Sequence, residues 1–127
     1  MNFPDNCKYT EDHEWIRIEA GNTALVGITE YAQGELGELV YVEVETVGST
    51  VDAGGVFGTV EAVKTTSDLL MPVKGKVLEL NGALDANPGL INEDPYGEGW
   101  IVRIAIENPG DLDGLMNAAA YQAHIGA

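Results

Sequence analysis

The residue with the clearest chemical potential in this sequence is Lys64, in the segment VEAVKTTSD that spans residues 60–68. Branched residues that favour strands lie on both sides of it, and small polar residues follow it directly. A protein that carries a covalently bound group needs a long, flexible amine at a rigid turn that a modifying enzyme can reach. A solvated lysine in an ordinary hairpin turn is the alternative interpretation. The spacing is compatible with both, and the attachment site is the sharper hypothesis.

Residues that support independent catalysis are scarce. The two histidines, His13 and His124, show no zinc-binding spacing, and His13 fits a role at the entry to a strand. The sequence contains neither a Gly-x-Ser-x-Gly motif nor a phosphate-binding loop that ends in Lys-Ser or Lys-Thr. The run Asp111-x-Asp113-Gly114 lacks the remaining ligands of a calcium loop and indicates a helix start. We therefore predict neither a catalytic site nor a metal site.

The size and composition of the chain predict one folded domain, residues 1–127. A chain of 127 residues is typical of a single domain, and folding buries roughly two thirds of the surface that is exposed when unfolded. Cys7 is the only cysteine, which excludes an internal disulfide and fits a reducing compartment. The first twenty residues lack a signal-peptide pattern, and no apolar run approaches the roughly 18 residues of a membrane span. We predict a cytoplasmic protein, or the mature form of a mitochondrial one.

The charge of the chain limits its partners. Six Lys and Arg residues against 21 Asp and Glu residues give a formal net charge of −15 and a pI near 4.1. Nucleic acids and anionic membranes both require clustered basic residues, so neither is an expected partner. An acidic surface favours cationic partners and partners with basic patches. The chain has only four lysines: Lys8, Lys64, Lys74 and Lys76.

Short strands separated by glycine dominate the pattern. Strands are predicted at residues 14–18, 23–28, 39–45 and 100–106, with further short ones between residues 47 and 80. In the third of these, alternation predicts that Val40, Val42 and Val44 share the buried face. The sequence therefore predicts a mainly β fold, a flattened barrel or sandwich.

Two helices complete the predicted fold. Thr29 is expected to cap a short internal helix that ends at Gly37. Residues 81–99 are expected to form a polar loop. A C-terminal helix is predicted to follow a cap at Asn108 or Asp111. Its apolar residues at helical spacing are Leu112, Leu115, Met116, Ala119 and Ala123.

An ordered series of motifs, from about Lys8 to Tyr121, resembles the H proteins of the glycine cleavage system, a family of lipoyl carriers. The matching segments are KYT at 8–10, HEW at 13–15, VGIT at 26–29, YAQ at 31–33, LG at 36–37, VYVE at 40–43, VG at 47–48, VEAVKTTSD at 60–68, PVxG at 72–75 and NxDPYGEGW at 92–100. The resemblance implies a β-barrel or sandwich of the lipoyl (hybrid) type, and a carrier rather than an enzyme.

The resemblance also implies roles for individual residues. Lys64 would carry lipoic acid through an amide bond. Glu61 and Gly75 match positions that the lipoylating enzyme needs, Glu61 as a recognition charge and Gly75 in a turn that faces the lysine. Glu14 and Asp68 match residues of a cleft where the loaded lipoyl arm docks.

The partners that the resemblance implies are enzymes that use the lipoyl arm in turn. A pyridoxal-phosphate-dependent glycine decarboxylase would load an aminomethyl group from glycine onto the arm. An aminomethyltransferase would pass the one-carbon unit to tetrahydrofolate, and a dihydrolipoamide dehydrogenase would restore the disulfide. A lipoate ligase or lipoyltransferase would attach the cofactor. The carrier itself is expected to be a monomer, since a serial shuttle gains little from a permanent partner.

The chain departs from the family pattern at two places. Glu45-Thr46 stands where the family usually has a proline and an acidic residue, and Met71 stands where Ser or Ala usually precedes Pro72. An H-like lipoate-binding protein of a sulfur-oxidation pathway, with heterodisulfide-reductase-like partners, is therefore an alternative. A biotinyl carrier is disfavoured because that family flanks its lysine with methionines, whereas Val63 and Thr65 flank Lys64 here.

Overall fold

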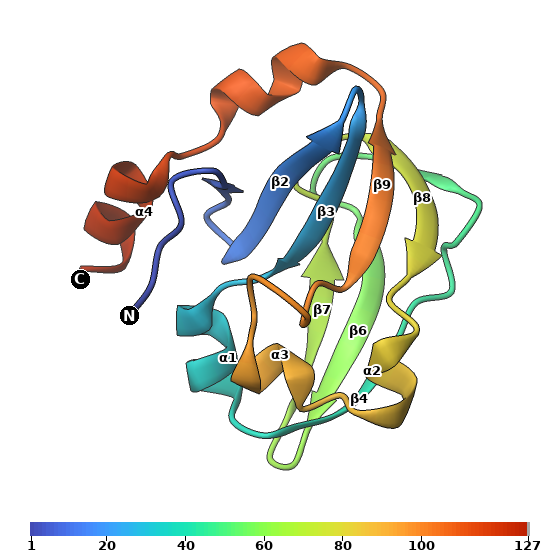
Figure 1. Ribbon diagram of the computed structural model, residues 1–127, viewed down its shortest axis with the longest axis vertical. Helices are drawn as coiled ribbons and strands as arrows, with labels where there is room; N and C mark the ends of the chain where they lie inside the picture. Colours follow the sequence, from blue (N-terminus) through green and yellow to red (C-terminus); the bar gives the residue numbers. More distant parts are fainter. Residues whose placement is uncertain (127) are drawn as a thin grey trace.

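The computed structural model describes residues 1–126 and folds them into two antiparallel sheets with short helices at their edges (Figure 1). The larger sheet has the strand order β1 (Lys8–Tyr9), β2 (Glu14–Ala20), β3 (Thr23–Ile28), β9 (Val102–Ile106), β8 (Gly75–Leu80) and β5 (Thr50–Val51). The smaller sheet has the order β4 (Leu39–Glu43), β6 (Val56–Ala62) and β7 (Thr66–Leu70). The predicted mainly β fold is confirmed. No helix in residues 1–126 is long and apolar enough to cross a membrane.

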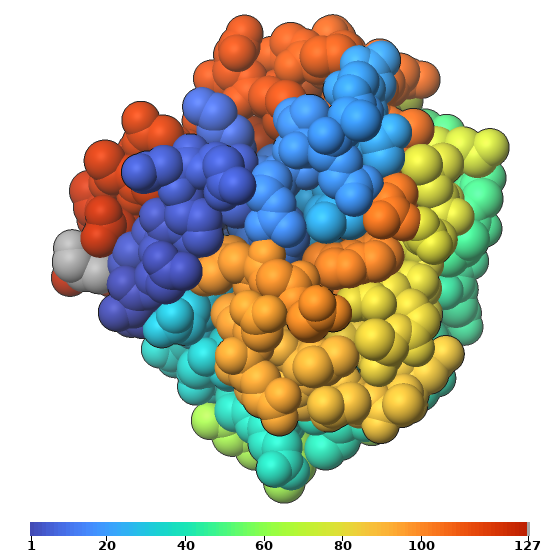
Figure 2. Space-filling model, viewed as in Figure 1, coloured from blue at the N-terminus to red at the C-terminus, as the bar shows by residue number. Residues whose placement is uncertain are grey.

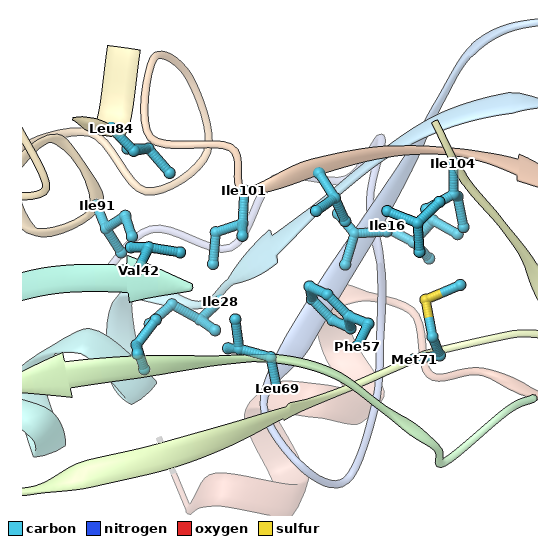
Figure 3. Packing of buried hydrophobic residues seen from close by; sticks show 14 of the residues in the cluster. Ile16, Ile28, Val42, Phe57, Leu69, Met71, Leu84, Ile91, Ile101 and Ile104 are labelled. Carbon is cyan, nitrogen blue, oxygen red and sulfur yellow. The ribbon is translucent and has the colours of Figure 1, made fainter. Parts of the chain in front are cut away.

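The main hydrophobic core lies between the two sheets (Figure 3). Ile16 and Ile104 enter it from the six-stranded sheet, and Phe57 and Leu69 from the three-stranded sheet. All four side chains are at most 1% exposed. Burial on this scale is the main favourable term that holds two such sheets together.

Strand β4 departs from the predicted alternation. Leu39 lies opposite Ala62 and Tyr41 lies opposite Glu61, so Val40 is an extra residue in the ladder. This bulge turns Val40 outward, where it is 43% exposed, while Val42 remains buried. The expectation that Val40 shares the buried face with Val42 is therefore wrong, and the bulge is the reason.

The first helix, α1 (Glu30–Leu36), begins and ends where the sequence predicts. The Thr29 hydroxyl accepts a hydrogen bond from the Ala32 amide at 3.1 Å, which caps the first turn. Gly37 ends the helix with φ of 84°, a left-handed conformation that glycine adopts without steric cost.

The segment at residues 81–99 is more ordered than a loop. It contains two single-turn helices, α2 (Ala83–Ala86) and α3 (Leu90–Glu93), which bury Leu84 and Ile91 in the main core (Figure 3). Glycines occupy both N-cap positions, and each helix is only four residues long, so local sequence signals for them are weak. The predicted polar loop is corrected accordingly.

The predicted C-terminal helix is divided into two. A 3₁₀ helix, η1 (Pro109–Gly114), is capped by Asn108 as predicted, and α4 (Ala118–Ile125) has its own cap at Asn117. Between them the backbone of Met116 pairs with Tyr9, which places the C-terminal segment beside the N-terminal one (Figure 2). This bridge interrupts the predicted helix between Gly114 and Ala118. Ala119 and Ala123, which were predicted to lie on its apolar face, are exposed in α4.

Close packing between Gly27 and Trp15 gives a test of the fold. A Cβ at Gly27 would lie 2.7 Å from the Trp15 ring, which is fully buried and donates its Nε1–H to the Pro95 carbonyl. We expect Gly27→Ala to lower the free energy of unfolding by about 1–3 kcal/mol because the ring must move. Gly34→Ala, in α1 with nothing within 4 Å of the new Cβ, should raise it by about 0.5–1 kcal/mol. Urea unfolding measures both, and equal stability of the two variants would contradict the packing argument.

Candidate functional site

Lys64 lies in the loop of the hairpin that joins β6 and β7. The Ala62 amide donates to the Thr65 carbonyl at 2.7 Å, so Val63 and Lys64 form a two-residue loop. Neither loop residue has positive φ, since His13 is the one non-glycine residue with that conformation in residues 1–126. The hairpin projects at the lower end of the molecule (Figure 1), which presents the exposed lysine to solvent on a rigid support.

The hairpin loop contacts the segment between α1 and β4. The Val63 amide donates to the Glu38 carbonyl at 3.0 Å. The Lys64 side chain passes Gly37 closely, since a Cβ at Gly37 would lie 3.4 Å from Lys64 Cε. The hairpin loop is thus held against the segment that joins α1 to β4, and the aliphatic part of the Lys64 side chain packs beside Gly37.

Asn92 holds that second segment in place. Its Nδ2 donates to the Gly37 carbonyl at 2.8 Å and to Gln33 Oε1 at 2.9 Å, and its Oδ1 accepts from the Leu39 amide at 3.0 Å. Asn92 therefore joins the end of α1 to the start of β4. Sequence reasoning found residues 92–100 as a family motif and gave Asn92 no structural role, because its bonds reach residues more than 50 positions away.

A pocket of about 310 Å³ lies beside the hairpin, between α1, β7 and the start of β2. The predicted residues Glu14 and Asp68 both line it, although they are far apart in the sequence. Two further carboxylates, Asp12 and Glu35, line it too. Sequence reasoning missed Glu35, which follows the lining residue Tyr31 by one helical turn on the same face of α1. The pocket is thus strongly acidic.

Glu14 is the most buried of these carboxylates. Only 3% of the residue is exposed, and its Oε1 accepts a hydrogen bond from the Thr10 hydroxyl at 2.8 Å. The Leu70 amide lies 3.4 Å from the other oxygen. Burial raises the pKa of Glu14 to about 7, and the hydrogen bonds from Thr10 and Leu70 oppose part of that rise. Glu14 therefore titrates near neutral pH at the wall of the pocket.

His13 has a structural role next to the pocket. Its φ is 70°, and its Nδ1 lies 2.9 Å from the Tyr121 hydroxyl. That hydroxyl also lies 2.8 Å from Thr29 Oγ1, at the cap of α1. Burial lowers the pKa of His13, and the nearby His124 acts in the same direction. His13 thus links α4 to the helix that forms one wall of the pocket.

The structure separates the other two predicted residues. Glu61 is exposed on β6, opposite Tyr41 on one side and Thr66 on the other, and lies close to the hairpin loop. Gly75 is the first residue of β8 in the other sheet, at the opposite end of the molecule from the hairpin (Figure 1). The expectation that Gly75 lies in a turn facing the lysine is wrong. A Cβ there would lie 2.6 Å from the Ala105 carbonyl oxygen, so close strand pairing explains the glycine.

Comparisons with known proteins agree with these motifs. A family model described as glycine cleavage H-protein matches residues 7–126. A Bacteroides fragilis glycine cleavage system H protein is 56% identical over 127 residues and covers 100% of both chains. One from Chlorobaculum tepidum is 54% identical over 127 residues and covers 99% of both.

A crystal structure of a glycine cleavage system H protein from Mycobacterium marinum superimposes with a TM-score of 0.87 at 39% identity. The match covers 98% of this chain and 100% of the other. These findings confirm the resemblance and the fold class, and they do not support the sulfur-oxidation alternative. The chain belongs to the glycine cleavage H-protein family.

Proposed function

We propose that this chain is the lipoyl carrier of a glycine cleavage system and that Lys64 is its lipoylation site. The observation that carries the proposal is the placement of Lys64 in a two-residue hairpin loop beside an acidic pocket. The amine would form an amide with the carboxyl group of activated lipoate, which removes the lysine charge. When bound, the dithiolane supplies the chemistry, since its sulfurs can accept a one-carbon unit and exchange electrons with thiols.

The residues around Lys64 suit such an arm. Asp68 lies four residues after Lys64, a distance of roughly 13 Å along an extended strand. A lysine extended by an acyl chain can follow β7 over that length and enter the pocket. The pocket also has apolar walls that a hydrocarbon chain can contact. They are formed by Ala32 and Leu36 of α1 and by Leu69 of β7.

The acidic groups of the pocket would hold a cationic group on the arm. Glu14 and Asp68 lie on different walls of the pocket, and Asp12 and Glu35 add to its negative potential. A bound ammonium group would favour the ionised form of Glu14, because an opposite charge nearby lowers the pKa of a carboxyl group. The pocket would also keep bulk water away from the loaded group.

The rest of the chain fits a carrier that docks in turn on several enzymes. The proposed clients are a glycine decarboxylase, a tetrahydrofolate-dependent aminomethyltransferase and a dihydrolipoamide dehydrogenase, and the chain itself is not an enzyme. A net charge of −15 favours rapid, electrostatically steered encounters with basic patches on such partners. We place this carrier, a single domain, in the cytoplasm.

Intact mass spectrometry tests the attachment site. Protein produced in a host supplied with lipoate should gain the mass of one lipoyl group. Lys64→Arg should remove the gain, because arginine cannot form the amide. Lys76→Arg, at another exposed lysine in β8, should keep it. An unmodified wild-type chain, or a Lys64→Arg variant that still carries the group, would contradict the assignment.

Carboxyl exchange tests the pathway. Fully lipoylated protein should support the exchange of labelled bicarbonate into glycine by a purified glycine decarboxylase, because the arm is the acceptor in that reaction. The unlipoylated chain and Lys64→Arg should give no exchange above the background of the enzyme alone. No exchange with the lipoylated chain would instead favour a carrier for a different client.

The buried carboxyl of Glu14 predicts a pH-dependent stability. Its pKa is raised from 4.5 to about 7 in the folded state, so the folded chain holds a proton that the unfolded chain has lost between those values. The stability that this bound proton adds to the folded state is fully present below about pH 4.5 and is lost as the pH rises to about 7. As the pH rises from 4.5 to 8, the free energy of unfolding of Glu14→Gln should therefore increase by about 3 kcal/mol relative to that of the wild type.

Urea unfolding at several pH values measures this difference. Ser67→Ala, which lines the same pocket without a titratable group, is the matched control and should track the wild type. If Glu14→Gln also tracks the wild type across this range, the raised pKa of Glu14 is wrong.

A further inference from the structure

Three exposed apolar side chains gather around the hairpin that bears Lys64. Val40 is 43% exposed, Tyr41 is 53% exposed and Val63 is 71% exposed. They account for three of the eight large hydrophobic residues that are exposed in residues 1–126. Together with Glu61, which lies opposite Tyr41, they form a surface that we call the β4 patch.

The backbone makes the β4 patch continuous. Tyr41 and Glu61 are cross-strand partners, so their side chains leave the same face of the sheet. The Val63 amide bonds to the Glu38 carbonyl, which holds the hairpin loop next to the start of β4. The bulge at Val40 adds an outward valine beside Tyr41, where regular alternation would have turned that residue inward.

The exposed apolar side chains of the patch are unfavourable in the free protein, and no side chain in residues 1–126 buries them. One exposed tyrosine and two exposed valines leave apolar surface in contact with water. Bulges near functional sites often redirect a side chain. Tyrosine is also among the residues that contribute most to binding when a partner covers them.

Charge around the patch indicates the partner. Glu38, Glu43 and Glu61 are all exposed, and Lys64 is the only Lys or Arg in β4, β6, β7 or the loop between β6 and β7. Basic groups on a partner would therefore meet carboxylates on both sides of an apolar centre. The surface fits a protein that offers an apolar slot bordered by Lys or Arg side chains.

We propose that the β4 patch is the docking surface for the enzyme that acylates Lys64. The inference rests on the proposed function and names the partner of the unmodified carrier. Tyr41 and Val40 fill an apolar slot of that enzyme, next to the contact that the family resemblance already implies for Glu61. They hold the hairpin so that Lys64 Nζ reaches the activated acyl group.

The topology distinguishes this enzyme from those that use the finished arm. β4 is one edge strand of the three-stranded sheet and β7 is the other, with β6 between them. The acidic pocket lies on the β7 side. The unmodified Lys64 side chain runs past Gly37, which follows the pocket residue Leu36 at the end of α1 and leads into β4. The β4 patch and the β7 wall of the pocket thus lie at opposite edges of the sheet, so an enzyme can bind the patch without covering that wall.

Steady-state lipoylation by a lipoate ligase, with lipoate and ATP, tests the proposal. Tyr41→Ser should lower kcat/KM about tenfold, mainly through KM, and Val40→Ser about threefold. Tyr41→Phe keeps the ring and should stay within twofold of wild type. Val56→Ser is the matched control, since Val56 is 47% exposed at the far end of β6 in the same sheet. Thermal unfolding of each variant confirms that it is folded.

A second measurement separates the partners. Each variant is lipoylated to completion with excess ligase and assayed with dihydrolipoamide dehydrogenase and glycine decarboxylase. We expect rates within twofold of wild type. Lower rates here with unchanged lipoylation would assign the patch to a client enzyme and overturn the proposal. A wild-type dimer in sedimentation that Tyr41→Ser abolishes would also overturn it, in favour of a second copy of the chain.

Two outcomes of the lipoylation assay distinguish a failure of this proposal from a failure of the proposed function. Absence of any lipoylation of the wild-type chain at Lys64 would contradict the carrier function itself. Normal lipoylation of the wild type, Tyr41→Ser and Val40→Ser alike would contradict only the docking surface.

Discussion

One side-chain amide joins the parts of the molecule that present Lys64. Asn92 uses both of its amide atoms, donating to Gly37 and Gln33 and accepting from Leu39. The chain must leave α1 and enter β4 within this short span, and Gly37 does so with a left-handed conformation. Because the Lys64 stem and the Val63 amide both contact this segment, the position of the hairpin loop depends on these hydrogen bonds. Buried donors left without partners cost more than the bonds themselves contribute.

Local signals account for the parts of the fold that the sequence predicts correctly. β3 and α1 match the prediction because alternation, a threonine cap and a terminal glycine each act within a few residues. Lys64 could be found for the same reason, since small and branched residues around it predict a hairpin. The errors lie where distant contacts decide. The bulge in β4 depends on pairing with β6, and the break before α4 depends on the bridge from Met116 to Tyr9.

The same distinction between local signals and distant contacts applies to the candidate site. The sequence alone could not bring Glu14 and Asp68 together, because one begins β2 and the other lies in β7, in the other sheet. The family resemblance grouped them, and both line one pocket. The pocket also has a supporting network that no local pattern reveals. Tyr121 in α4 contacts both His13 and Thr29 through its hydroxyl, and its ring stacks on Tyr9 with centroids 4.8 Å apart. The C-terminal helix thus fixes the entry to α1, and α1 forms one wall of the pocket.

Gly75 shows that a residue can match a functional motif for a structural reason. It pairs with Val51 and Ile106 across two strand boundaries, and a side chain at this position would meet the Ala105 carbonyl. β9 pairs in turn with β3, and β3 leads through Thr29 into α1. A larger residue at position 75 would therefore disturb strand pairing first, and would reach Lys64 only through that chain of elements. Glu61 is the reverse case, because it is exposed beside the hairpin and a partner can touch it directly. The glycine at position 75 thus serves strand pairing, and of the two residues only the exposed Glu61 remains a candidate for the proposed recognition role.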